Sequence, residues 1–151
     1  MKHLTLTILI CTLFMSCKTE QQNGLVTKDS PYNVEITYNK LRTIIDTNPN
    51  LKILLELDHS KNAASVDLEL NSTKIIMFGN PKLGTSLMQA SPTASIDLPQ
   101  KIIVYTTDNK TAKIAYNNPT YLKERHNIEG KDAILLKITD ALDNITNKVI
   151  E

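Results

Sequence analysis

The side chains best suited to acid–base or metal chemistry occur at two places in this sequence. Asp58 and His59 are adjacent in LELDHS, Asn62 follows one helical turn later, and His126 ends the segment YLKERH. Imidazole and carboxylate groups bind zinc, copper or iron, so His59 and His126 would form a metal or haem site if the fold brought them together. They are distant in the sequence and belong to no short ligand motif. Hydrogen bonds that fix loops at the ends of strands and helices are the simpler interpretation, and no cofactor is predicted.

Enzymatic chemistry is a weaker interpretation of the same residues. A nucleophilic mechanism requires an activated thiol or hydroxyl beside an oriented base. The two cysteines, Cys11 and Cys17, both lie near the start of the chain, and no serine lies in a GxSxG motif. Asp58 and His59 would point to opposite faces of a strand. A hydrolase or isomerase of unrecognised type is therefore an alternative to a binding function, and no catalytic residue is assigned.

The segment FGNPKLGTSLMQASPT, residues 78–93, contains two of the four glycines in the chain. Gly79 and Gly84 are separated by four residues, as the glycines of a P-loop are. Thr85 and Ser86 follow, however, where that motif requires lysine and then serine or threonine. Phosphate binding is therefore not favoured.

Local signals in this segment instead predict one or two short helices. Asn80 before Pro81 is typical of a helix start, because asparagine caps the first turn and proline is tolerated at the first helical position. Leu83, Leu87 and Met88 would then share one apolar side. Ser91 before Pro92 is a second helix-start signal of the same kind.

The first seventeen residues, MKHLTLTILICTLFMSC, are organised as a secretory signal, with a basic start and an apolar run too short to span a bilayer. The ending FMSC resembles the lipobox of bacterial lipoproteins, which implies cleavage before Cys17 and transfer of a diacylglycerol to its thiol. Such acyl chains would hold the protein on a membrane. The expected location is the cell envelope. The outer membrane is favoured because Lys18 stands where aspartate retains some lipoproteins at the inner membrane. An ordinary signal cut nearby, or an uncleaved anchor, is the alternative.

Charge limits the class of partner. The chain has 17 basic and 16 acidic residues, and Lys2 is the one charged residue of the signal, so the mature chain would be close to neutral. Nucleic-acid-binding proteins carry a net basic face, so a nucleic-acid partner is not expected. Because the mature domain would contain no cysteine after Cys17, it would fold without a disulfide.

The elements expected from the sequence form one domain. Residues 1–16 are interpreted as the signal, 17–30 as the lipidated cysteine and a flexible polar tether, and 31–151 as the domain. Alternating or β-branched apolar residues predict strands over 32–37, 51–57, 74–78, 101–106 and 111–116, the last two joined as a hairpin. Helical spacing predicts a helix around 41–45 and a long one over 134–149. Such elements favour an α+β fold, an antiparallel sheet of about five strands with helices on one face.

At family level, FGNPKLGTSLMQASPTASIDLP followed by KIIVYTTDNKTAKIAYNNPTYLKERH resembles the family called domain of unknown function 302. LDHSKNAASVDLEL resembles a strand-to-loop segment of the same family, so the resemblance covers about residues 32–130. It implies a TATA-binding-protein-like arrangement of one strand, a helix, four strands and a helix. It also implies a homodimer, because members are often dimers, and it implies no activity. One departure is Asp67, where the family generally has glycine.

These observations favour a non-catalytic protein of the cell envelope that binds a small ligand or another protein. We expect a polar-rimmed cleft at one edge of the sheet, where several strands and helices end. The residues expected to form it are Asp58, His59, Asn62, Gly79, Asn80, Gly84, Thr85, Tyr116, Asn117 and His126.

Overall fold

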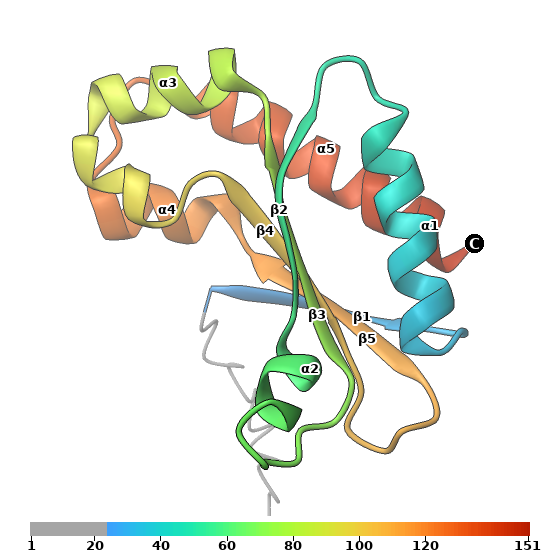
Figure 1. The fold of residues 1–151 in the computed structure, drawn as a ribbon. Helices are drawn as coiled ribbons and strands as arrows, with labels where there is room; N and C mark the ends of the chain where they lie inside the picture. The colour runs from blue at the N-terminus through green and yellow to red at the C-terminus, as the bar shows by residue number, and fades with distance from the viewer. Residues whose placement is uncertain (1–23) are drawn as a thin grey trace, which may run out of the picture.

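The computed structural model describes residues 24–151, whose helices and strands are shown in Figure 1. The predicted signal, the predicted lipidation site Cys17 and the first part of the predicted tether lie outside these residues. In chain order the elements are β1 (Leu25–Ser30), α1 (Val34–Asp46), β2 (Lys52–Asp58), α2 (His59–Ala64), β3 (Thr73–Gly79), α3 (Pro81–Ala90), the 3-10 helix η1 (Pro92–Ile96), β4 (Gln100–Tyr105), β5 (Ala112–Asn117), α4 (Pro119–His126) and α5 (Asp132–Ile150).

The strands form one five-stranded antiparallel sheet in the order β1-β5-β4-β3-β2. This confirms the predicted α+β class and the order of one strand, a helix, four strands and a helix, with α2, α3, η1 and α4 as short additions. The predicted strands over 51–57, 74–78, 101–106 and 111–116 are β2 to β5. The predicted hairpin joins β4 to β5.

Helices α1 and α5 lie on the same face of the sheet, and the core lies between them and the strands (Figure 1). Ile76, Ile102 and Ile114 point to this face from three neighbouring strands and are fully buried. Leu41 of α1 and Leu142 of α5 cover them and are buried to the same degree. Burying such side chains contributes about 1.5–3 kcal/mol each, so this layer dominates the stability of the domain.

The prediction of a strand over residues 32–37 is wrong. Asn33 caps α1 instead, and its Oδ1 accepts a hydrogen bond from the backbone N–H of Ile36 at 2.9 Å. Val34, Thr37 and Tyr38 are buried while Ile36 is 48 % exposed, which is the spacing of a helix. Six residues with alternating apolar side chains fit either period, and the capping asparagine decides between them.

The predicted tether also ends earlier than expected. Residues 25–30 of that segment form β1, which pairs with β5 over six residues from Leu25↔Asn117 to Ser30↔Ala112. The sequence LVTKDS is polar because β1 is an edge strand. Its Lys28 reaches α5, where Nζ contacts Asp143 Oδ1 at 3.0 Å. The backbone ladder to β5, which composition does not reveal, holds this strand in place.

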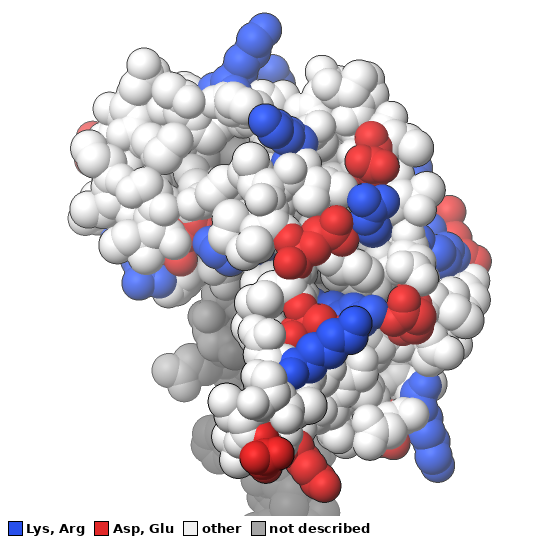
Figure 2. Space-filling model, in the orientation of Figure 1, with Lys and Arg blue, Asp and Glu red and all other residues white. Residues whose placement is uncertain are grey.

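Charges of both signs alternate on the surface formed by α1 and β2, whereas the surface over α3 carries few charges (Figure 2). Arg42 of α1 forms ion pairs with Glu56 of β2 at 3.1 Å and with Asp46 at 3.6 Å. Exposed pairs of this kind contribute about 1 kcal/mol or less. A cavity opens at the sparsely charged surface over α3.

Candidate functional site

A cavity of about 300 Å³ lies beneath α3, between the ends of β2, β3 and β4 and the middle of α5. Its floor consists of buried side chains, namely Phe78, Leu98, Gln100, Ile138, Leu142 and Ile145. One wall comes from α3 and the turn before it, through Gly79, Asn80, Leu83, Gly84, Thr85 and Met88. Lys52 and Leu54 of β2 and Pro81 of α3 are exposed and line the mouth. The volume is at the lower end of the range for small-molecule sites.

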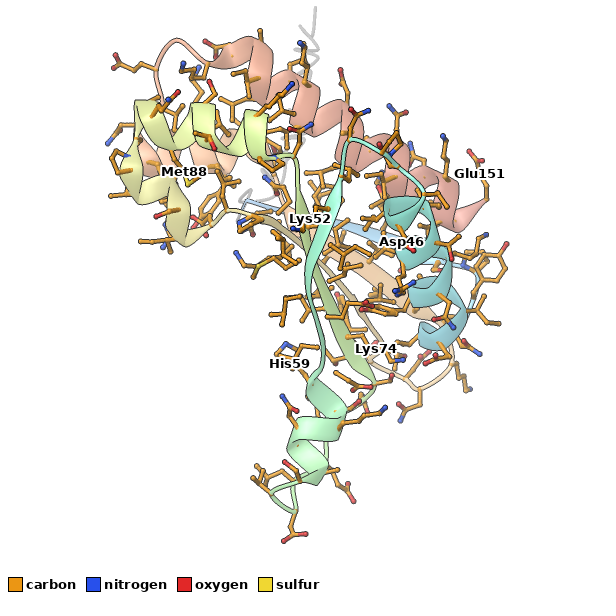
Figure 3. All side chains as sticks on the ribbon, turned by 45° about the horizontal axis from the view of Figure 1, so that its top comes forward. Asp46, Lys52, His59, Lys74, Met88 and Glu151 are labelled. Carbon is orange, nitrogen blue, oxygen red and sulfur yellow. The ribbon has the colours of Figure 1, made fainter. Side chains whose placement is uncertain are left out.

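The sequence FGNPKLG sets the position of the α3 wall. Oδ1 of Asn80 accepts the backbone N–H of Lys82 at 3.0 Å, and Pro81 occupies the first turn, so α3 begins where the sequence predicts. Leu87 is fully buried and packs α3 onto the core. Met88 of α3 and Lys52 of β2 lie on opposite sides of the cavity, with Lys52 near the start of α3 and Met88 near its end (Figure 3).

Gln100 differs from the other residues in the floor of the cavity. It begins β4 opposite Phe78 of β3, on the sheet face that carries Ile102 and Val104, and it is 7 % exposed. Within residues 24–151, its Nε2 is the one fully buried side-chain nitrogen or oxygen without a hydrogen-bond partner. Leaving a buried amide donor unpaired costs about 1–3 kcal/mol. Among the described residues, the floor of the cavity is therefore apolar except for this amide.

A second group of polar side chains joins η1 to α4. His126 Nδ1 lies 3.0 Å from Thr93 Oγ1, and His126 Nε2 lies 2.7 Å from Asp97 Oδ2. Arg125 Nη1 contacts the same carboxylate at 3.3 Å. The imidazole is 3 % exposed and the Asp97 side chain 11 %. The histidine thus acts as a connector between two short helices.

The order hydroxyl, imidazole, carboxylate in this group is also that of a hydrolytic triad. Such a triad needs a substrate cavity at the hydroxyl and donors for the developing oxyanion. Thr93 does not line the cavity beneath α3, nor the shallower hollow between α1 and α5. Positioning η1 is therefore the role that the geometry of Thr93, His126 and Asp97 supports.

Asp58, His59 and Asn62 lie in and before α2, at the far end of β2. Asp58 caps α2, where Oδ1 accepts hydrogen bonds from Ser60 Oγ at 2.6 Å and from the backbone N–H of Lys61 at 3.1 Å. Partial burial raises the pKa of Asp58, but these hydrogen bonds outweigh it and the pKa is lowered. Asp58 is therefore accounted for as a helix cap.

Tyr116 and Asn117 lie at the end of β5. The Tyr116 hydroxyl donates to Asp143 Oδ1 at 2.7 Å beneath α5, and burial together with this bond raises the pKa of Tyr116. The same bond, with that from Lys28, lowers the pKa of Asp143. Asn117 pairs with Leu25 of β1, and the next residue, Asn118, caps α4. Both predicted residues have structural partners away from the cavity.

The prediction that all ten candidate residues converge on one cleft is wrong. Gly79, Asn80, Gly84 and Thr85 line the cavity, and the other six do not. Strands β2 and β3 are antiparallel, so Lys52 pairs with Gly79 while Asp58 pairs with Lys74 at the opposite end. Six residues of strand separate these ends by about 20 Å. The turn after β2 and the turn after β3 therefore face opposite ends of the sheet.

The two histidines are not brought together. His59 lies at the start of α2, and Figures 1 and 3 both place α2 at the other end of the molecule from α4, which carries His126. In the described part of the chain, no three His, Cys, Asp or Glu side chains form a group that could hold a metal ion. His126 fixes a loop as the simpler interpretation proposed, although its partners are side chains rather than backbone carbonyls.

Sequence reasoning missed the residues that complete the cavity, above all Gln100 and Leu98. One signal was available: glutamine stands where the alternation of β4 demands an apolar residue, since Ile102 and Val104 continue its face. A polar residue in a buried register indicates either a structural partner or a ligand. The contribution of Ile138 and Leu142 from α5 depends on tertiary packing and has no local signal.

The described residues thus form an α+β domain with helices on one sheet face and an apolar cavity at one end. A family model described as domain of unknown function DUF302 matches residues 26–147, and the chain belongs to this family. The solved structure of an uncharacterized conserved DUF302 protein from Bacillus stearothermophilus superposes with a TM-score of 0.74 at 19 % identity. That match covers 84 % of this chain and 98 % of the other. It shows the shared fold.

Two curated relatives are named "Fluoride-specific ion channel FluC 1", one from Brucella suis biovar 1 (strain 1330) and one from Brucella abortus biovar 1 (strain 9-941). Each is 29 % identical over 115 residues, which is 76 % of this chain but 45 % and 42 % of the relatives. The chain therefore spans less than half the length of these proteins. Among the helices of residues 24–151, none is both long and apolar enough to cross a membrane.

Proposed function

We propose that this protein is a membrane-tethered binding domain whose small apolar ligand occupies the cavity beneath α3. The observation that carries the proposal is the cavity itself, about 300 Å³ in volume with a floor of buried apolar side chains and one unpaired amide. Ligand sites are typically concave and apolar with a few placed polar groups. Four of the residues expected to bind a ligand, Gly79, Asn80, Gly84 and Thr85, line it.

Gly84 offers a direct test. A Cβ atom at Gly84 would meet no other atom within 4 Å, so a larger side chain has room to extend along the cavity wall. We expect Gly84→Phe to occupy the cavity and to abolish binding of 2-methylnonane, a branched alkane used as probe. Binding is measured from chemical-shift changes of the Leu98, Ile138 and Leu142 methyl groups. Gln89→Phe, on the exposed side of α3, is the matched control and should leave binding unchanged.

Two results would contradict the proposal. One is that the wild-type methyl signals do not move when the alkane is added. The other is that Gly84→Phe and Gln89→Phe weaken binding equally, because this would indicate a nonspecific surface effect rather than occupation of the cavity.

The tether is a second part of the proposal and rests on the sequence alone. We propose that the chain is cleaved before Cys17 and that this cysteine carries the lipid that holds the domain at the cell envelope, with the outer membrane favoured. The intact mass of the membrane-extracted protein checks it. A mass that begins at Met1 with an unmodified Cys17 would contradict it.

The partner that we propose for the open side of the sheet is a second copy of the chain. Helices cover one sheet face, and the opposite face carries Leu55, Leu57, Ile75, Met77 and Ile103, which we call the open face. These residues are neighbours across β2, β3 and β4, and Leu55 is 46 % exposed. A continuous apolar surface of this kind favours association.

A further inference from the structure

The unpaired amide of Gln100 bears on the chemical class of the ligand. The side chain starts β4 beside Leu98 in the floor of the cavity, and its Nε2 is buried without a partner. Neither Nε2 nor Oε1 of Gln100 makes a hydrogen bond to another residue of the range 24–151, so turning the amide about its last torsion to bring Nε2 to the cavity breaks none. The floor can therefore present an amide N–H to a molecule that reaches the bottom.

An amide N–H donates, so its complement is an oxygen acceptor that enters the cavity first. The other buried floor residues, such as Phe78, Ile138 and Leu142, are apolar. Among residues 24–151, the one charged residue that lines the cavity is Lys52, which is exposed at the mouth. A carboxylate at the floor would lose its hydration without a cation to pair with, and this is costly. The acceptor at Gln100 should therefore be uncharged.

We infer that the cavity binds an uncharged carbonyl compound with an apolar body, such as a ketone, quinone or ester, inserted with its oxygen against Gln100. This rests on the proposed function, because it requires the cavity to be a ligand site. A volume of about 300 Å³ accommodates a body on the order of ten heavy atoms. Neutral hydrogen bonds contribute modestly, so apolar contact supplies most of the affinity and Gln100 supplies the preference for a carbonyl.

The experiment compares nonan-2-one with 2-methylnonane, which has the same shape with a methyl group in place of the oxygen. The protein is the ¹⁵N-labelled full chain carrying Cys17→Ser, so that no acyl group of its own competes. We expect the ketone to bind about three- to tenfold more tightly than the alkane and to shift the side-chain NH₂ signals of Gln100, which the alkane leaves in place. In Gln100→Met, of similar size, the ketone should lose this advantage and bind more weakly than the alkane, because its carbonyl oxygen would be buried without a donor.

The outcomes distinguish a failure of the proposed ligand site from a failure of the proposed preference for a carbonyl. If neither probe binds, the proposed function fails. If both bind with equal affinity and the Gln100 signals do not respond, the cavity is a ligand site but the preference for a carbonyl is overturned. Tighter binding of nonanoate than of the ketone, lost in Lys52→Ala and kept in Gln100→Met, would overturn it in favour of a carboxylate held at the mouth.

Discussion

At the scale of single residues, two glycines share a left-handed backbone conformation but differ in what lies around them. Gly24 has φ +73° and Gly130 has φ +65°, a region that L side chains rarely adopt. A Cβ at Gly24 would overlap the ring of Tyr121, whereas a Cβ at Gly130 would meet no atom within 4 Å. Gly24 also accepts a hydrogen bond from the backbone N–H of Asn118 at 2.8 Å. It therefore fixes the approach of β1 to α4.

We expect Gly24→Ala to lower the free energy of unfolding by about 2–3 kcal/mol, from backbone strain plus steric overlap. Gly130→Ala carries the strain alone and should cost about 1 kcal/mol. Urea denaturation of both variants measures the difference. Equal losses would show that the Tyr121 ring moves aside without cost and that β1 is not fixed at this point.

Asp67, where the family generally has glycine, keeps the backbone that glycine would supply. Its φ is +59°, and it ends the turn after α2, where Leu68 N–H donates to Ala63 O at 3.0 Å and Asp67 N–H to Ala64 O at 3.3 Å. This is the Schellman arrangement at a helix end, in which aspartate is tolerated in place of glycine. Aspartate therefore adopts the left-handed backbone conformation at this helix end.

At the scale of elements, the hydrogen bonds of His126 join η1 to α4. Removing the ring would leave Asp97 with Arg125 as its remaining side-chain partner and would open a cavity in a buried site. We expect His126→Ala to destabilise the domain by about 2–3 kcal/mol. His126→Gln, whose amide can still reach Asp97, should recover part of the loss. Thermal and urea unfolding measure both.

His59→Ala is the matched control for this prediction. The His59 ring has no hydrogen bond to another described residue, so its removal should change stability by about 0.5 kcal/mol or less. A loss at His126 as small as the one expected at His59 would show that the contacts of His126 with Thr93 and Asp97 contribute nothing to stability.

The elements also show what the sequence could predict and what it could not. Strands β2 to β5 and helix α5 follow from apolar runs and helical spacing, and α3 from the Asn80–Pro81 start, because these signals are local. The polar sequence of β1 predicts a tether, because the pairing of this strand with β5 is distant in the chain and leaves no local signal. The cavity was half predicted: the turn before α3 was singled out, but Gln100 and the α5 residues join it only through packing.

At the scale of the whole molecule, the two sheet faces differ in what covers them. One face is buried under α1 and α5, and the open face, Leu55, Leu57, Ile75, Met77 and Ile103, points away from these two helices. Five strands of about six residues make a face roughly 20 Å on each side, the same order as one side of a standard protein interface. A single patch that pairs with itself generates a closed two-fold dimer.

Met77 lies centrally in the open face, opposite Leu55 of β2 and Lys101 of β4, and is the position at which to test the dimer. We expect the Cys17→Ser chain to sediment as a dimer in analytical ultracentrifugation and Met77→Asp to sediment as a monomer, because a carboxylate among the apolar residues of the open face would have to lose its hydration on association. Leu136→Asp is the matched control, since Leu136 is 60 % exposed on α5, on the helical side of the sheet, and should leave the dimer intact.

A monomer at high micromolar concentration without any substitution, or a dimer that Met77→Asp leaves intact, would contradict pairing through the open face. The cavity beneath α3 has its floor on the helical side, so ligand binding should be unchanged in the Met77→Asp monomer.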